Sequence, residues 1–169
     1  MPRVLGPADA VGEMRNGILL GPGTGDNMAA ALGIGARPGD VVVSLGTSGV
    51  IFRVSAQFDP APEQAVHAFA HALPQRWHQM SVMLSAASAL GWLARLSGTP
   101  ETQLSAMVAA MPLARRMQAP LFLPYLQGER TPHNNPLLTA NLSGLQAGHE
   151  LADLAYAVME GVGLGLLDG

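Results

Sequence analysis

The chain has 169 residues, of which 49% are hydrophobic and 12% charged, so it carries enough apolar side chains for a buried core. Its formal net charge is −3, and all nine basic residues are Arg. This composition gives no basic field for nucleic acid and excludes both a lysine Schiff base and the lysine-dependent phosphate loop.

The absence of cysteine excludes disulfides, thiolate zinc sites and a cysteine nucleophile, and it fits a reducing compartment. There is no charged-then-apolar leader and no run of about 18 uncharged apolar residues. We therefore expect a cytoplasmic protein with no membrane partner.

The first part of the chain predicts a strand, a glycine turn and a helix. Residues 1–16 lack a lasting period and are expected to be irregular. The apolar run 17–20 then leads into Gly21, Gly23 and Gly25, and the alanine-rich run 26–36 favours a helix that begins at Asp26. Proline, glycine and aspartate at 38–40 stop this helix and suggest a domain boundary.

The middle of the chain is rich in β-strand signals. Apolar runs or alternation, separated by turn residues, predict a meandering sheet whose strands cover residues 41–45, 50–54, 65–73 and 77–83.

Helical spacing then dominates the second half. Met83, Ala86, Leu90 and Leu93 share one stripe, and the Gly-Thr-Pro sequence at 98–100 ends that helix before another at 101–111. Residues 121–126 predict a strand that enters the polar loop 127–136. An apolar stripe beginning at Leu151 predicts a helix that runs to the end of the chain, where nothing follows to cover it, so the chain looks truncated.

Asp26 has two interpretations. As the acid at a helix start, it can accept hydrogen bonds from unpaired backbone N–H groups, and on the residue alone this is the favoured interpretation. Alternatively, the glycine turn presents its carboxylate as a general base for a substrate hydroxyl that attacks a phosphoryl group. Both roles coexist only if the side chain faces a cleft.

The Gly-Thr-Ser-Gly sequence at 46–49 also permits two interpretations. It is typical of a hairpin turn, and its hydroxyls and N–H groups equally suit a concave anion site. The glycines at 21–25 miss the dinucleotide-binding spacing.

Other candidate residues favour structural roles. His67 and His71 share one face of a strand without the Glu of a zinc-protease helix. Gly161, Gly163 and Gly165 favour close helix packing. Glu129, Arg130 and His133 crowd a loop that is either a solvated connection or a ligand-facing one.

Four segments together resemble the FGGY group of sugar kinases. They are Gly-Thr-Gly-Asp-Asn at 23–27, Ser-Leu-Gly-Thr-Ser-Gly-Val at 44–50, the stretch 71–78 with 81–88, and the stretch 122–134. The resemblance covers almost the whole chain beyond about residue 17. Within the group, it is most similar to members that phosphorylate the pentulose D-xylulose with ATP.

The resemblance implies an α/β fold, as part of the two-domain, actin-like and ribonuclease H-like ATPase fold of sugar kinases. Residues 1–39 would be the tail of the first domain and 40–169 the beginning of the second, so the chain is expected to be an internal fragment, inactive when isolated. Asp26 would be the catalytic base and Asn27 a substrate-binding residue. Gly46, Thr47 and Ser48 would contact the phosphates of ATP, which carries Mg²⁺.

The resemblance also allows a homodimer. Another sugar or polyol kinase of the group, acting on ribulose, glycerol or a deoxy sugar, is the nearest alternative. A non-catalytic remnant that pairs with other chains is a further alternative.

Overall fold

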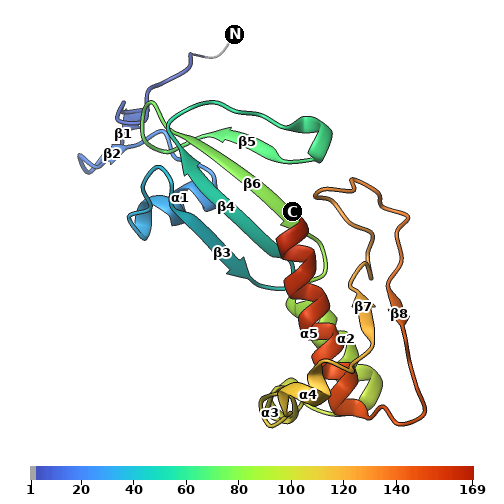
Figure 1. The fold of residues 1–169 in the computed structure, drawn as a ribbon. Helices are drawn as coiled ribbons and strands as arrows, with labels where there is room; N and C mark the ends of the chain where they lie inside the picture. Colours follow the sequence, from blue (N-terminus) through green and yellow to red (C-terminus); the bar gives the residue numbers. More distant parts are fainter. Residues whose placement is uncertain (1–2) are drawn as a thin grey trace. The chain divides into compact units, whose positions relative to one another are not determined.

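The computed structural model describes residues 3–169, so the expectation for residues 1–16 lies partly outside the described residues. Figure 1 shows the elements, which in chain order are β1 (Gly12–Glu13), β2 (Leu19–Leu20), α1 (Asp26–Gly33), β3 (Val41–Leu45), β4 (Gly49–Ser55), the 3-10 turn η1 (Pro62–Gln64), β5 (His67–Ala70), β6 (Trp77–Met83), α2 (Ala87–Ser97), α3 (Glu101–Ala109), α4 (Leu113–Arg116), β7 (Leu121–Leu123), β8 (Asn141–Ser143) and α5 (Leu151–Asp168).

Most of the elements expected from the sequence are present. The bounds of β3 and β6 are the predicted ones, and α1 begins at the predicted Asp26. The chain before residue 17 is less irregular than expected, because β1 pairs antiparallel with β2, Gly12 opposite Leu20.

The expected meander is wrong in one respect. Its four strands have the order β3-β4-β6-β5, so β6 rather than β5 neighbours β4. Strand β5 pairs antiparallel with β6 at the edge, with Phe69 opposite His78. Local patterns identify strands and hairpins but carry little information about which strand lies in the centre.

The chain divides into two compact units. One contains residues 3–42, 52–61 and 67–80, and the other contains residues 43–51, 62–66 and 81–169. In the first unit, the β1–β2 hairpin is exposed throughout, whereas Phe52 and Val54 are buried.

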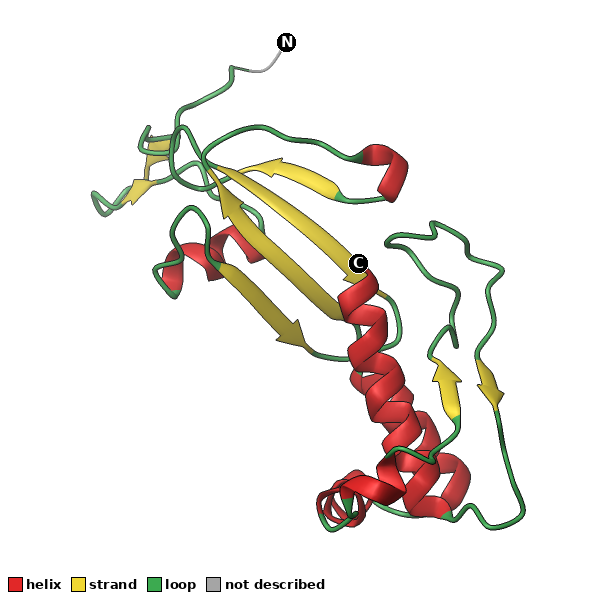
Figure 2. Ribbon diagram, viewed as in Figure 1, coloured by secondary structure: helices red, strands yellow, loops and turns green. Residues whose placement is uncertain are grey.

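The second unit contains a hydrophobic core between helices α2, α3 and α5 and strand β7. Ala89, Leu93, Leu104, Phe122 and Val158 are among its buried members. Helix α5 contacts α2, α3 and β7, and β7 pairs antiparallel with β8, as Figure 2 shows in yellow beside the red helix. The stripe that begins at Leu151 thus faces this core.

Two glycines of α5 permit its close approach to β7 and to the last residue of β6. A Cβ on Gly161 would overlap the carbonyl oxygen of Phe122, and one on Gly165 would lie 2.9 Å from the Met83 methyl carbon. The prediction of close packing is confirmed for these two positions, although the neighbours are not helices. Gly163 has nothing within 4 Å of such a Cβ, so the prediction is wrong there.

Helix α2 begins later than its apolar stripe suggests. Met83 is the last residue of β6, and α2 starts at Ala87. The helix ends where expected, because Gly98 has a φ of 69° and takes the left-handed conformation that glycine adopts without strain.

Candidate functional site

Asp26 is presented by a glycine turn at the start of α1. Gly23 has a φ of 70°, and Gly25 is the extended residue that precedes the helix. Asp26 is therefore the first helical residue, and its side chain is exposed. Its Oδ1 accepts a hydrogen bond from the backbone N–H of Asn27 at 2.8 Å. Asp26 thus bonds one N–H group of the first turn, but the expected cap role is wrong, because Gly25 occupies the cap position and α1 has no side-chain cap bond.

Asn27 contributes to the orientation of this carboxylate. Its side-chain Nδ2 lies 3.4 Å from Asp26 Oδ1, the same oxygen that its backbone N–H contacts. One carboxylate oxygen is thus held by its neighbour while the group as a whole stays accessible. This arrangement suits a group that accepts a proton from an incoming hydroxyl.

Residues 46–48 form the tight connection between β3 and β4. The N–H of Gly46 donates to the carbonyl oxygen of Ser48 at 3.0 Å, and all three residues are exposed. The turn interpretation is therefore correct, and it is compatible with the anion-site interpretation, because exposed N–H and hydroxyl groups remain on the same turn.

The predicted site residues fall in different units. Asp26 and Asn27 belong to the first compact unit, whereas Gly46, Thr47 and Ser48 belong to the second.

The polar loop that follows β7 is not a solvated connection. Buried side chains of the loop bond it to the main chain at the end of β6. Glu129 is 3% exposed, and its Oε1 accepts hydrogen bonds from the N–H groups of Leu84 at 2.9 Å and Arg130 at 2.7 Å. Thr131 Oγ1 accepts from the N–H of Val82 and donates to the carbonyl of Ala65, both at 3.0 Å. These contacts give Glu129 a structural role.

His133 connects this loop with α5. Its Nε2 lies 2.9 Å from the hydroxyl of Tyr125 and 3.3 Å from Oδ2 of Asp168. Burial, and then the negative charges of Asp168 and Glu129, raise the pKa of Tyr125 above its ordinary value.

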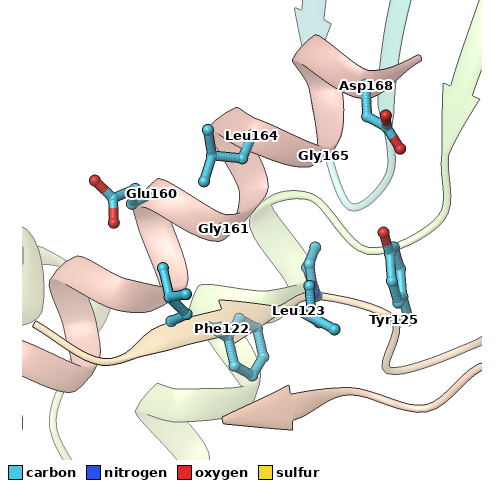
Figure 3. Close-up of a pocket in the computed structure, with 10 residues that line it drawn as sticks. Phe122, Leu123, Tyr125, Glu160, Gly161, Leu164, Gly165 and Asp168 are labelled. Atoms are coloured by element: carbon cyan, nitrogen blue, oxygen red, sulfur yellow. The ribbon is translucent and has the colours of Figure 1, made fainter. Parts of the chain in front are cut away.

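A hollow of about 310 Å³ lies between β7 and α5 (Figure 3). Leu123 and Leu164 contribute apolar walls, and Tyr125 and Asp168 lie at one end. A second hollow of about 230 Å³ is lined by Leu45, next to the 46–48 turn, and by apolar residues of α2 and α5. None of the predicted site residues lines either hollow.

His71 and His78 contribute to packing and local hydrogen bonding rather than to a metal site. His71 Nδ1 accepts the N–H of Leu73 at 3.0 Å, and the buried ring of His78 stacks on Phe52 with 4.3 Å between ring centroids. Within residues 3–169, no cluster of three or more His, Asp or Glu side chains is arranged to hold a metal ion. No helix in that range is long and apolar enough to cross a membrane.

Comparison with known proteins gives a family match over most of the chain. Residues 41–169 match the C-terminal domain of the FGGY family of carbohydrate kinases. The chain is 48% identical over 180 aligned residues to the xylulose kinase of Klebsiella pneumoniae, with 100% of this chain and 37% of that protein covered. It is 54% identical over 149 residues to the xylulose kinase of Escherichia coli K12, with 87% of this chain and 30% of that protein covered.

A solved structure described as a xyloylose kinase from Brucella ovis is also similar. It has a TM-score of 0.92 and 40% identity, with 99% of this chain and 37% of that chain covered. The chain therefore spans about a third of the length of these relatives, between 30% and 37%.

Proposed function

Because the chain belongs to the FGGY family of carbohydrate kinases, we propose that it takes part in the ATP-dependent phosphorylation of a pentulose, D-xylulose, to D-xylulose 5-phosphate. The observation that carries this proposal is the 48% identity to a xylulose kinase along the whole chain. The actin-like, ribonuclease H-like α/β fold of sugar kinases, expected from the sequence, is confirmed by the family and structural matches.

The domain boundary stays a proposal. We place the tail of the first domain at residues 1–39 and the beginning of the second at residues 40–169. The support for this division is that the match to the family's C-terminal domain begins at residue 41.

Asp26 is the proposed base. As the terminal hydroxyl oxygen of the sugar forms its bond to the γ-phosphorus of ATP, the carboxylate accepts the hydroxyl proton, the bond from the γ-phosphorus to the bridging oxygen breaks, and ADP leaves. The contacts of Asn27 with Oδ1 support this role, because they fix the carboxylate without burying it. Asn27 is the proposed substrate-binding neighbour.

Gly46, Thr47 and Ser48 are the proposed contacts for the phosphates of ATP. Support comes from the exposure of this turn and from its hydroxyl and N–H groups, which are suitable donors for phosphate oxygens. Mg²⁺, carried with ATP, would neutralise phosphate charge during transfer.

Location and assembly are part of the same proposal. We infer a cytoplasmic protein that binds a small sugar and ATP and takes neither nucleic acid nor a membrane as partner. The net charge of −3 and the absence of cysteine support this inference. A homodimer is the proposed assembly.

A chimera tests the proposed activity. The chain replaces the aligned 180 residues of the Klebsiella pneumoniae relative, and ADP release with D-xylulose is measured in a coupled assay. We expect turnover in the chimera and a loss of about 10²–10⁴-fold on Asp26→Asn, because the amide keeps the shape of the carboxylate but cannot accept the proton.

Asp9→Asn is the matched control, since Asp9 is also exposed and also accepts one local backbone N–H, that of Gly6 at 2.8 Å. Turnover in Asp26→Asn equal to that of Asp9→Asn would remove the base assignment. A folded but inactive chimera would contradict the kinase function and favour a non-catalytic role. A panel with ribulose and glycerol separates the alternative substrates.

A further inference from the structure

The turn at residues 46–48 is bound through its main chain to the start of α2. The carbonyl oxygen of Gly46 accepts the N–H of Ala87 at 3.0 Å. The carbonyl oxygen of Thr47 accepts the N–H groups of Ala86 at 3.1 Å and Ser88 at 3.2 Å. We call residues 86–88 the α2 clamp.

These bonds replace a side-chain cap. The first N–H groups of an α-helix have no partner within the helix, and Ser, Thr, Asp or Asn usually supplies one. Ala86 precedes α2 and makes no side-chain cap bond. The carbonyl groups of the turn supply the missing acceptors, so the start of the helix and the shape of the turn depend on each other.

The same bonds fix the direction of two N–H groups. A trans peptide is planar, and its N–H points opposite to its C=O. Because the carbonyl groups of Gly46 and Thr47 point at the α2 clamp, the N–H groups of Thr47 and Ser48, which belong to the same two peptides, point away from it. Both residues are exposed, so two consecutive donors face outward together.

The far end of the turn is held by close packing. A Cβ on Gly49 would lie 3.1 Å from the Cβ of Ala86 and 2.9 Å from Cδ2 of Leu166. Ala86 itself is 1% exposed. A larger residue at position 49 would therefore push the turn away from the clamp.

We propose that the α2 clamp is a positioning element for phosphate binding, which holds the N–H groups of Thr47 and Ser48 in the orientation that receives the phosphates of ATP. This inference rests on the proposed function of the turn. It assigns a positioning role to Ala86, Ala87 and Ser88. These residues act through their backbone N–H groups rather than through their side chains.

Ala87→Pro removes one clamp bond. Ala87 is the first residue of α2, and the substitution deletes the N–H that binds Gly46. It also pushes Ala86, whose ψ is −103°, toward the extended conformation that a residue before proline prefers, so it alters the clamp at two points. The 169-residue chain is titrated with MgATP, and the amide shifts of Thr47 and Ser48 are followed by ¹H–¹⁵N NMR. Adenosine serves as the phosphate-free ligand. We expect ATP binding at least about fivefold weaker than in the unsubstituted chain, with both amide signals displaced before ATP is added.

Leu113→Pro is the matched control, because it places proline at the first residue of α4 on an exposed side chain. It should leave both amide signals and ATP affinity unchanged. Circular dichroism melts of each variant show that the binding measurements are made on folded chains.

A second pair of variants tests the packing of the turn. Gly49→Ala should weaken ATP binding, and adding Ala86→Gly should restore it. The second change removes the Cβ of Ala86, which cannot move aside, whereas Cδ2 of Leu166 is the end of a flexible side chain that can turn away. A merely structural role would lower the melting temperature without this recovery of affinity.

The outcomes separate the two proposals. If the unsubstituted chain binds ATP without a response from Thr47 and Ser48, the phosphate assignment of the turn fails and the clamp proposal fails with it; the same holds if it binds no ATP. If it binds through these residues and both Ala87→Pro and Gly49→Ala bind equally well, only the positioning role is overturned.

Discussion

At the scale of single residues, two buried histidines make the stability of the first unit depend on pH. His78 is fully buried, and neither of its ring nitrogens has a hydrogen-bond partner in the described part of the chain. Burial, and then the nearby His71, lower the pKa of His78. Burial, and then Arg76, lower the pKa of His71. Both rings are therefore neutral in the folded chain under conditions where the unfolded chain binds protons.

We predict that acidification destabilises the fold. Stability is complete above the unfolded pKa of about 6.5 and falls as the pH drops from there toward the lowered folded values, by up to about 1.4 kcal/mol per pH unit for each extra proton bound by the unfolded chain. His78→Phe, which keeps a flat ring against Phe52, should reduce this slope. Urea unfolding at pH 7.5 and at pH 5.5 measures it, and an unchanged slope in the variant would contradict the assignment.

Single residues also show which parts of the candidate site can be predicted from the sequence. The position of Asp26 follows from a local signal, glycines followed by an acid and a helix-forming run, and the helix does begin there. The burial of Glu129 and Thr131 has no such signal. Their partners, Leu84 and Val82, come from a distant strand and the residue after it, so a polar loop and a buried polar anchor have the same local sequence.

At the scale of elements, helix α5 depends on glycine at one position and not at another. A Cβ on Gly161 would overlap main-chain atoms of Phe122, whereas one on Gly163 would meet nothing within 4 Å. Since both residues lie in the same helix, they form a matched pair.

We predict opposite effects of alanine at these positions. Gly161→Ala should destabilise the chain by about 1–3 kcal/mol, because strand β7 must shift to admit the methyl group. Gly163→Ala should stabilise it by up to about 1 kcal/mol through helix propensity. Chemical denaturation measures both changes, and equal effects of the two substitutions would refute the close approach of α5 to Phe122.

Elements also show why boundaries are harder to predict than periodicity. The stripe from Met83 to Leu93 has one helical spacing in the sequence, yet its first residue belongs to β6 and α2 begins only at Ala87. The acceptors that define this start are carbonyl groups of residues 46 and 47. At the other end, Gly98 is a local stop signal, and the predicted end of the helix is confirmed.

At the scale of the whole molecule, the protection of backbone amides from hydrogen exchange should be uneven along the chain. The hydrophobic core cluster lies entirely within the second unit, between α2, α3, α5 and β7. Between residues 3 and 25, by contrast, only Leu5 is even partly buried. Local opening is easier where few apolar contacts must be broken.

We predict that amide hydrogen exchange is slowest in α2, α5 and β7 and fastest in β1, β2 and α1. Mass spectrometry of peptic fragments at neutral pH measures the difference. Equal protection of residues 12–33 and of α5 would contradict this distribution.

The order of strands is the part of the whole fold that the sequence conveys least. Each strand of the four-stranded sheet is identifiable from its own residues, but the adjacency of β4 and β6 depends on contacts between distant segments. The family resemblance, by contrast, rests on motifs spread along most of the chain, which is why it predicted the fold class correctly.

The main-chain cap of α2 also has a consequence for folding. A helix whose first N–H groups are satisfied by its own side chains can nucleate alone, but the first turn of α2 obtains its acceptors from residues 46 and 47, far earlier in the sequence. Closing the intervening loop costs chain entropy before these bonds form. The capped first turn of α2 therefore forms only once the β3–β4 connection is in place. This local element thus depends on a long-range contact, and long-range contacts form slowly.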